Sequence, residues 1–243
     1  MEKTEFMRQY AEILQANRLE EFVTDELAEK FYLLTERMLE VNEHMNLTAI
    51  REVPDIIAKH YADSLMVAKY VPTGAKVIDV GCGAGFPSLP LAIARPDVTV
   101  TALDSTAKRV NYIAETAKLL GLDNVVTVAA RAEEKAKDAA FREKYDVAAA
   151  RAVARLNLLS ELCLGYVKVG GCFAAMKAEL GDELAEASRA ISTMGGKLEA
   201  ADTLTLSRPD GSTAARTIVT IRKKSPTPQN YPRNNSQITK KPL

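Results

Sequence analysis

Apolar residues in the first seventy positions recur at helical spacing. One run advances in steps of three and four: Leu27, Phe31, Leu34, Met38 and Val41. Thr24 stands where it can cap that helix, and the next two residues are acidic, which complements the charge of a helix N-terminus. A second run begins at Pro54, a favourable first helical residue. The pattern predicts two helices joined by a loop over 46–50.

From Gly74 onward the pattern changes to short apolar runs rich in Val and Ala, each followed by a helical segment. This alternation is typical of a parallel sheet whose faces are covered by helices. We expect strands at 76–80, 98–103, 125–129, 145–150 and 172–176. The turn Val169-Gly170-Gly171 is expected to introduce the fifth strand.

Two further strand-like stretches, 197–206 and 216–221, follow the last helical segment. The residues Arg208-Pro209-Asp210-Gly211 between them favour a hairpin. The predicted fold class is therefore α/β, with a mostly parallel, Rossmann-like sheet that ends in an antiparallel hairpin. This architecture resembles the usual plan of S-adenosylmethionine methyltransferases, although a fold alone does not determine a function.

The two ends of the chain differ from the sheet region in composition. We expect an N-terminal helical extension (1–72), a cofactor-binding methyltransferase domain (73–224) and an extended, proline-rich basic arm (225–243). The whole chain holds 32 basic and 32 acidic residues, so it does not attract nucleic acid through its net charge. No acidic residue occurs after Gly211, which makes the basic end the expected place for a contact with RNA.

The cysteines and the hydropathy of the chain argue against a disulfide-linked secreted protein and against a membrane-spanning protein. Cys82, Cys163 and Cys172 match no zinc or disulfide spacing, and no signal peptide is recognisable. Charged residues interrupt every apolar run before it reaches the length of a membrane span. We therefore expect a soluble, cytoplasmic protein, monomeric, with no bound metal and no membrane partner.

The most informative motif is a strand that runs into a glycine-rich turn and then a helix. Asp79 ends the strand, and Gly81, Gly83 and Gly85 follow at alternate positions, with Phe86 directly after them. Glycines here allow a sharp turn and let a ligand approach the backbone. A dinucleotide fingerprint would place its third glycine one residue later, so the spacing favours the methyltransferase version. Asp79 is placed to accept hydrogen bonds either from the cofactor or from loop amides.

Two other strand ends carry groups that suit an adenosine. Asp104 ends the second strand about twenty residues past the glycines, where a carboxylate accepts from the ribose hydroxyls of NAD or S-adenosylmethionine. Ala132 and Glu133 follow the third strand and are placed to offer a backbone amide and a carboxylate to the adenine edge. Because ligands of such sheets bind at the carboxyl ends of the strands, the three ends together predict one cofactor site.

Several motifs in order resemble one family, that of ribosomal RNA small subunit methyltransferase G, also called glucose-inhibited division protein B. The resemblance covers nearly the whole chain and rests on 46–48, 60–65, 79–87, 103–105 with 108–109, 131–133, 150–154 and the tail. It implies S-adenosyl-L-methionine as cofactor and methylation of guanine N7 in the 530-loop region of 16S rRNA. The partner it implies is 16S rRNA or a precursor of the small ribosomal subunit. It further implies that Gly81, Phe86, Ala132, Glu133 and Arg151 touch the cofactor or its surroundings.

The chemistry implied by the resemblance needs little acid–base machinery. Guanine N7 has an in-plane lone pair and no proton, so it can attack a sulfonium methyl group without a general base, and alignment supplies much of the acceleration. We therefore expect no catalytic side chain. Arg151, at the end of the fourth strand, is the positioning candidate, and a structural salt bridge is an equally good interpretation of that residue from the sequence. His60 is expected to be a packed or capping histidine.

Other functions stay open at the level of sequence. An NAD-dependent oxidoreductase could use the same sheet, and a methyltransferase of this fold could act on another RNA, on a protein or on a metabolite. A non-catalytic RNA-binding protein is a further alternative. For RNA binding the sequence offers Tyr231, which can stack on an unpaired base, and Arg233, Lys240 and Lys241, which can meet phosphates. A disordered solubilising tail is the competing interpretation of these residues.

Overall fold

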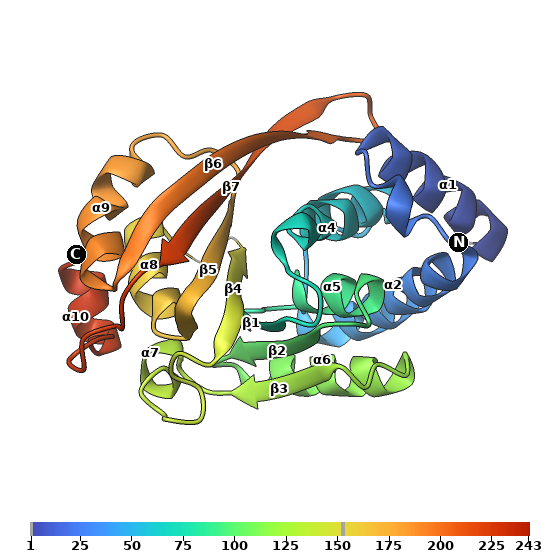
Figure 1. Ribbon diagram of the computed structural model, residues 1–243. Helices are drawn as coiled ribbons and strands as arrows, with labels where there is room; N and C mark the ends of the chain where they lie inside the picture. Colours follow the sequence, from blue (N-terminus) through green and yellow to red (C-terminus); the bar gives the residue numbers. More distant parts are fainter. Residues whose placement is uncertain (1, 152–153) are drawn as a thin grey trace.

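The computed structural model describes residues 2–151 and 154–243, and its centre is one seven-stranded sheet. The strand order is β3-β2-β1-β4-β5-β7-β6, with neighbours parallel from β3 to β5 and β7 antiparallel to both its neighbours (Figure 1). The strands are β1 Lys76–Val80, β2 Thr99–Asp104, β3 Val125–Ala129, β4 Tyr145–Arg151, β5 Val167–Lys177, β6 Gly196–Ser207 and β7 Thr213–Lys223. The α/β fold class and the terminal antiparallel hairpin are confirmed.

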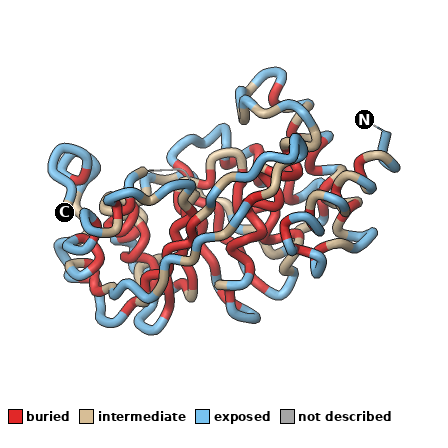
Figure 2. Tube along the Cα trace, turned by 90° about the horizontal axis from the view of Figure 1, so that it is seen from above, coloured by how far each residue is buried: buried red, intermediate tan, exposed pale blue. Residues whose placement is uncertain are grey.

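Side chains alternate across this sheet and build a core on each face. Val77 of β1 belongs to one core, and Ile78 beside it belongs to the other, because successive side chains of a strand point to opposite faces. Buried segments run through the centre of the molecule in Figure 2, whereas most exposed segments lie at its periphery. The helices that follow the strands are α5 Ser88–Ala94, α6 Ala107–Leu119, α7 Ala132–Lys135, α8 Leu156–Leu164 and α9 Glu183–Thr193.

The N-terminal residues are helical, as predicted, and share the first core with β1 and β2. Thr24 caps α2, since its Oγ1 accepts from the amide of Leu27 at 3.2 Å. The elements are α1 Lys3–Ala16, η1 Glu20–Phe22, α2 Asp25–Met45, α3 Val53–Ile56, η2 Ile57–Ala62, α4 Asp63–Leu65 and η3 Ala68–Tyr70. The helix predicted from Pro54 is not a plain α-helix, because η2 is a stretch of π-helix, a form that often occurs at functional sites.

The fifth strand begins earlier than the sequence indicates. Gly170 and Gly171, expected to precede it, lie inside β5, which starts at Val167. The pairing with β4 is irregular here, because Tyr145 pairs with Val167 but Val147 pairs with Cys172. A bulge with Gly170 at a φ of 89° absorbs the extra residues, so the glycines interrupt the register and do not begin the strand. The second strand, by contrast, starts at Thr99, one residue later than expected.

The β6–β7 hairpin crosses the top of the molecule in Figure 1 and its tip reaches α1. Its turn is closed by the amide of Gly211, which donates to the carbonyl of Arg208 at 3.0 Å. The side chain of Asn17 both donates to the carbonyl of Ser207 and accepts from its amide. The hairpin predicted from the Pro-Asp-Gly residues is confirmed, and it ties the N-terminal helices to the far edge of the sheet.

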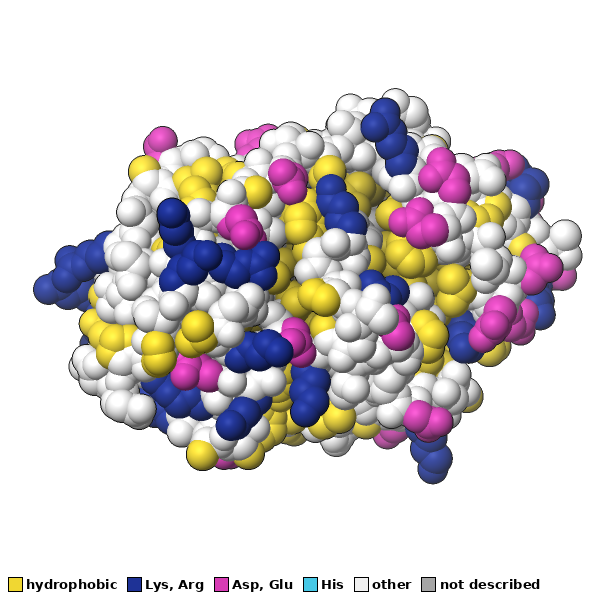
Figure 3. Space-filling view, in the orientation of Figure 1, with side chains coloured by type: hydrophobic (Ala, Val, Ile, Leu, Met, Phe, Trp, Pro, Cys, Tyr) yellow, Lys and Arg dark blue, Asp and Glu magenta, His cyan; other side chains and the backbone are white. Residues whose placement is uncertain are grey.

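Charges of both signs are interspersed on the surface. On the face drawn in Figure 3, Lys and Arg side chains alternate with Asp and Glu side chains and with apolar groups. This mixture agrees with the equal numbers of basic and acidic residues in the chain. Any attraction for a polyanion must therefore come from a local group of cations.

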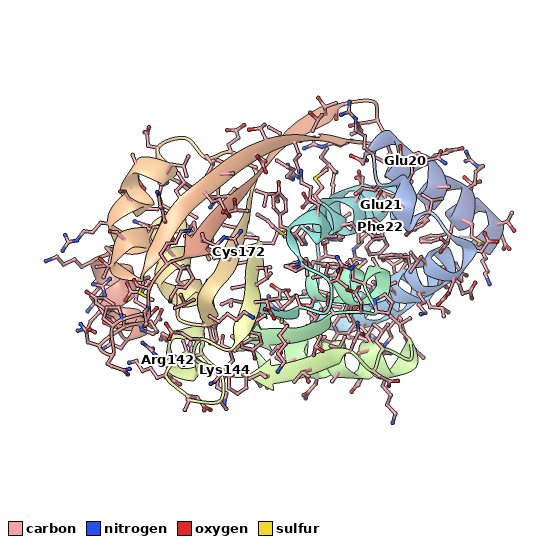
Figure 4. The ribbon with its side chains drawn as sticks, viewed as in Figure 1. Glu20, Glu21, Phe22, Arg142, Lys144 and Cys172 are labelled. Atoms are coloured by element: carbon pink, nitrogen blue, oxygen red, sulfur yellow. The ribbon has the colours of Figure 1, made fainter. Side chains whose placement is uncertain are left out.

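The C-terminal arm is not extended throughout, contrary to the prediction. Residues Asn235–Lys240 form α10, which begins with a capping box between Asn234 and Gln237 and buries Ile238. Its sequence signal, Asn and Gln three residues apart, is visible but is masked by the surrounding prolines. Arg142, labelled in Figure 4, holds the preceding segment by donating to the carbonyls of Thr227, Pro228 and Tyr231. The division of the chain at 72/73 and 224/225 stays a prediction.

Candidate functional site

A cavity of about 490 Å³ lies at the carboxyl ends of β1, β2 and β4, beside the turn after β3. The strand order reverses between β1 and β4, and a parallel sheet opens a crevice for ligands at such a point. Seven predicted cofactor residues line the cavity: Gly81, Gly83, Phe86, Asp104, Ala132, Glu133 and Arg151. The other two, Asp79 and Gly85, are not part of its lining.

The glycines of the turn have different structural roles. Gly81 has a φ of 77°, and its amide donates to the carbonyl of Leu103 at 2.8 Å, which fixes the turn against β2. A Cβ on Gly83 would have no heavy atom closer than 4.0 Å, so this position leaves space for a ligand. A Cβ on Gly85 would come within 2.8 Å of Leu89 and 3.3 Å of Ile113. Gly85 is therefore needed for helix packing.

Asp79 lies beneath the turn and is fully buried. Its Oδ2 accepts from the amide of Ser88 at 3.1 Å and from the Ser88 hydroxyl. Among the described residues its Oδ1 has no hydrogen-bond partner. Burial raises the pKa of this carboxyl to about 6, while the bonds from Ser88 act in the opposite direction. Asp79 is expected to accept from the cofactor or from loop amides; the contacts seen are with Ser88, the first residue of α5, and a contact with the cofactor stays a prediction.

Asp104 lines the cavity and also organises the glycine turn. Its Oδ2 accepts from the amide of Gly83 at 3.0 Å, and its Oδ1 accepts from the amide of Thr106 at 2.8 Å. A carboxylate oxygen can accept more than one hydrogen bond, so both oxygens keep capacity for a ligand. The adjacent wall is formed by Ala132 and the buried Glu133 at the start of α7.

The opposite wall is an aromatic and cationic stack. The ring of His60 lies on the ring of Phe86, with centroids 4.5 Å apart and planes 8° apart, and Arg151 lies 5.3 Å from the Phe86 centroid. His60 Nε2 lies 2.9 Å from the hydroxyl of Thr48. Burial, reinforced by the charge of Arg151, lowers the pKa of His60 to about 3. The imidazole is therefore neutral at pH 7.

Arg151 is held by the N-terminal helices. Its Nη1 donates to the carbonyl of Lys59 and to Oδ2 of Asp63, each at 2.9 Å. Asp63 is buried and also accepts from Nε of Arg216 at 2.6 Å. The salt bridge considered for Arg151 from the sequence exists, and it fixes the guanidinium at the rim of the cavity. Ala152 and Val153, part of the motif that contains Arg151, lie outside the described residues.

The structure adds lining residues that were not predicted to belong to the site. Thr48, His60, Arg109 and Asn235 all line the cavity. The motif around His60 is visible in the sequence, but its approach to Phe86 is not, since the two are joined only by tertiary packing. Asn235 comes from the other end of the chain, and only its capping neighbour signals that a helix begins there.

The predicted RNA-binding residues of the arm differ in availability. Arg233 donates from its backbone amide, Nε and Nη2 to the carboxylate of Glu161, at 2.6–2.9 Å for the closest contact of each, and Glu161 is only 1% exposed. Its guanidinium is thus committed to an internal ion pair. Tyr231 packs against the second core, whereas Lys240 and Lys241 are exposed. The RNA contacts themselves stay a prediction.

The remaining chemistry of the described residues is simple. They contain no group of three or more His, Cys, Asp or Glu side chains arranged to hold a metal ion. They also contain no helix with the length and apolar character needed to cross a membrane. The three cysteines are reduced and buried, and burial raises the pKa of each thiol, that of Cys82 beside the cavity included.

Comparison with known proteins agrees with this geometry. A model of the GidB family, described as rRNA small subunit methyltransferase G, matches residues 27–209. The chain belongs to this family. The "Ribosomal RNA small subunit methyltransferase G" of Brevibacillus brevis is 46% identical over 97% of this chain and 98% of its own. The protein of the same name from Lactobacillus helveticus is 41% identical over 95% and 97%.

Solved structures support the fold at lower identity. TYW2 of P. horikoshii in complex with MeSAdo has a TM-score of 0.53 and 19% identity, over 67% of this chain and 62% of that one. TYW2 of M. jannaschii in complex with AdoMet has a TM-score of 0.51 and 17% identity, over 66% and 76%. The precorrin-6y C5,15-methyltransferase of Geobacter metallireducens has a TM-score of 0.51 and 18% identity, over 74% and 91%. These likenesses establish a methyltransferase fold.

Proposed function

We propose that the chain uses S-adenosylmethionine to methylate N7 of a guanine in the 530-loop region of 16S rRNA, in the cytoplasm. The observation that carries the proposal is the cavity at the reversal of strand order, whose two walls combine the glycine turn and Asp104 with Phe86, His60 and Arg151. The family gives the reaction class, and the cavity gives a place for the reactants.

The residues of the first wall fit the cofactor. The open space above Gly83 admits a ligand close to the backbone, and the Asp104 carboxylate at the end of β2 suits two ribose hydroxyls. A volume of about 490 Å³ lies within the range of ordinary ligand sites. Ala132 and Glu133 are available to the adenine edge. The bound cofactor supplies a methyl group activated by sulfonium.

The second wall positions the acceptor without proton transfer. Guanine N7 carries no proton, so the site needs no base, and the neutral His60, stacked on Phe86 and bonded to Thr48, gives the wall a fixed shape. Arg151, fixed by Asp63 and the carbonyl of Lys59, is the positioning residue for the acceptor. Alignment of the reactants accounts for the acceleration in this proposal.

Contact with RNA would depend on local cations near the cavity. Arg109 and Arg131 line it, and within the described part of the chain neither has a hydrogen bond or an ion pair from its side chain. Lys240 and Lys241 are exposed on the arm, whose Asn235 reaches the same cavity. These groups suit the phosphates of an RNA that enters between the arm and the sheet edge.

The test is transfer of tritiated methyl groups from S-adenosylmethionine to small ribosomal subunits, naked 16S rRNA and protein extract in parallel. We expect label in the RNA, at a guanosine where reduction and aniline treatment cleave the chain. Asp104→Ala is the cofactor-deficient control. Label only in protein, or in RNA other than 16S rRNA, would replace the proposed substrate. If calorimetry shows binding of NADH and none of S-adenosylhomocysteine, the proposed cofactor is wrong.

A further inference from the structure

A second cavity, of about 310 Å³, adjoins the cofactor cavity, and Arg151 lines both. It lies beyond the carboxyl ends of β4 and β5 and is completed by the hairpin strand β7 and by α4. Its apolar lining is Met176 and Ala178. Three acidic and three basic side chains share the walls: Asp63, Glu179, Glu183, Arg151, Lys177 and Arg216.

Five of these six charges are paired with one another. Asp63 joins Arg151 and Arg216 at 2.9 and 2.6 Å, and Lys177 Nζ lies 2.8 Å from Glu183. Glu179, in the segment between β5 and α9, is exposed and has no hydrogen bond or ion pair with any residue that the structure describes. The five paired groups are two carboxylates and three cations, so they leave one excess positive charge, and the unpaired carboxylate of Glu179 is the acceptor of this cavity with both oxygens available to a ligand.

We propose that this cavity holds the base of the methyl acceptor and that Glu179 selects guanine, an inference that rests on the proposed function. Guanine carries N7 on its Hoogsteen edge and the donors N1–H and N2–H on the neighbouring Watson–Crick edge. In this proposal N7 lies at the cofactor cavity beside Arg151, and the donor edge enters the second cavity. One carboxylate accepts both donors side by side, as proteins read a flipped base by its Watson–Crick edge.

Glu179 also rejects the competing bases. Adenine has an unprotonated N1 at the same place. This nitrogen and the carboxylate are both hydrogen-bond acceptors and repel each other. Inosine keeps N1–H but lacks the N2 amine, so it forms one bond fewer. A hydrogen bond to a charged group contributes enough for a preference of about tenfold or more. The cavity is therefore expected to bind guanine most tightly, hypoxanthine less tightly and adenine most weakly.

The direct test titrates GMP, IMP and AMP into the full chain loaded with S-adenosylhomocysteine, followed by NMR. We expect the wild type to bind GMP about tenfold more tightly than IMP. Glu179→Gln should bind GMP about tenfold more weakly and lose the preference over IMP, with unchanged affinity for S-adenosylhomocysteine. Asp182→Asn is the matched control, because it removes one exposed charge of the same segment outside the cavity and should keep the preference.

A second measurement separates this inference from the proposed function. Glu179→Gln should lower kcat/KM for small-subunit RNA about tenfold without changing KM for S-adenosylmethionine. Equal binding of GMP and IMP by the wild type, or an unchanged preference in Glu179→Gln, would overturn the assignment even if RNA is methylated. If no RNA is methylated while the preference still depends on Glu179, the base site stands and the proposed function fails.

Discussion

The ion pair between Arg233 and Glu161 predicts that Arg233 stabilises the arm. Glu161 lies on α8 and its side chain is 1% exposed, whereas that of Arg233 is 18% exposed. The Arg233 pKa is raised because its guanidinium donates to this carboxylate. Arg233→Met leaves a buried carboxylate without its cation. Breaking a buried pair costs about 3–5 kcal/mol, and the partial exposure of Arg233 favours the lower end, about 3 kcal/mol.

Urea denaturation at pH 7 measures this loss, and hydrogen exchange over 225–243 locates it. A loss of about 3 kcal/mol corresponds to a fall in melting temperature of roughly 6–12 °C for a chain of this size. Lys240→Met is the matched control: it removes an exposed cation of the same arm and should change the free energy of unfolding by less than about 0.5 kcal/mol. Adding Glu161→Leu to Arg233→Met should recover part of the stability, because an apolar pair replaces the lone charge, while the backbone amide of residue 233 loses its acceptor.

The reasoning is refuted if Arg233→Met unfolds at the same urea concentration as the wild type. If that variant keeps its stability but binds 16S rRNA more weakly, with a flatter salt dependence, the guanidinium leaves Glu161 to meet a phosphate. If the double variant is no more stable than Arg233→Met, the cost arises from lost packing and not from an unpaired carboxylate.

Three further predictions concern the glycine turn and its surroundings. Asp104→Ala should weaken S-adenosylhomocysteine binding about 10- to 150-fold in calorimetry and also lower the melting temperature, because two amides lose their acceptor. Gly85→Ala should destabilise the protein by about 1–3 kcal/mol more than Gly211→Ala in urea unfolding, since both have positive φ but only the former has neighbours within 4 Å. The pKa of Asp79 is raised to about 6, so its contribution to the free energy of unfolding falls as pH rises from about 4 to 6. The pKa of His60 is lowered to about 3, so its contribution rises with pH up to about 6.5. Asp79→Asn should therefore steepen the rise in unfolding free energy between pH 4 and 6, and an unchanged slope would refute the shift.

The cavity wall that contains the glycine turn and Asp104 could be predicted, because its signals are local in the chain. Gly81 and Gly83 follow directly on a strand, and Asp104 ends the next strand, so the rule that parallel strands share one edge brings them together. The same rule brings Ala132 and Glu133 to this edge, where they line the cavity. It does not separate Gly83 from Gly85, because both are glycines with positive φ and only tertiary packing shows that the second meets Leu89.

Phe86 and Arg151 of the opposite wall were named from the sequence, but their contacts could not be predicted, because these join distant parts of the chain. Arg151 meets Asp63 at a separation of 88 residues, and Arg216 meets it at 153. From the sequence Asp63 and Arg216 are ordinary charged residues, and nothing local indicates that they pair with the positioning candidate Arg151. The ion pair of Arg233 could not be predicted for a related reason: an arginine in a basic arm suits a phosphate, and only the fold places the buried Glu161 beside it.

This contrast explains which part of the function a motif can specify. The wall with the glycine turn and Asp104 is built from consecutive strand ends, so under the proposed function a chain that keeps these residues keeps its cofactor site. The opposite wall and the second cavity are assembled from the N-terminal helices, β4 and the terminal hairpin. Asp63 fixes Arg151 and Arg216 there through two ion pairs. Because Glu179 is the carboxylate of the second cavity that no described cation pairs with, the choice of methylated base in our proposal depends on packing across the whole chain. A change in the N-terminal helices can therefore alter the acceptor while the cofactor motif remains intact.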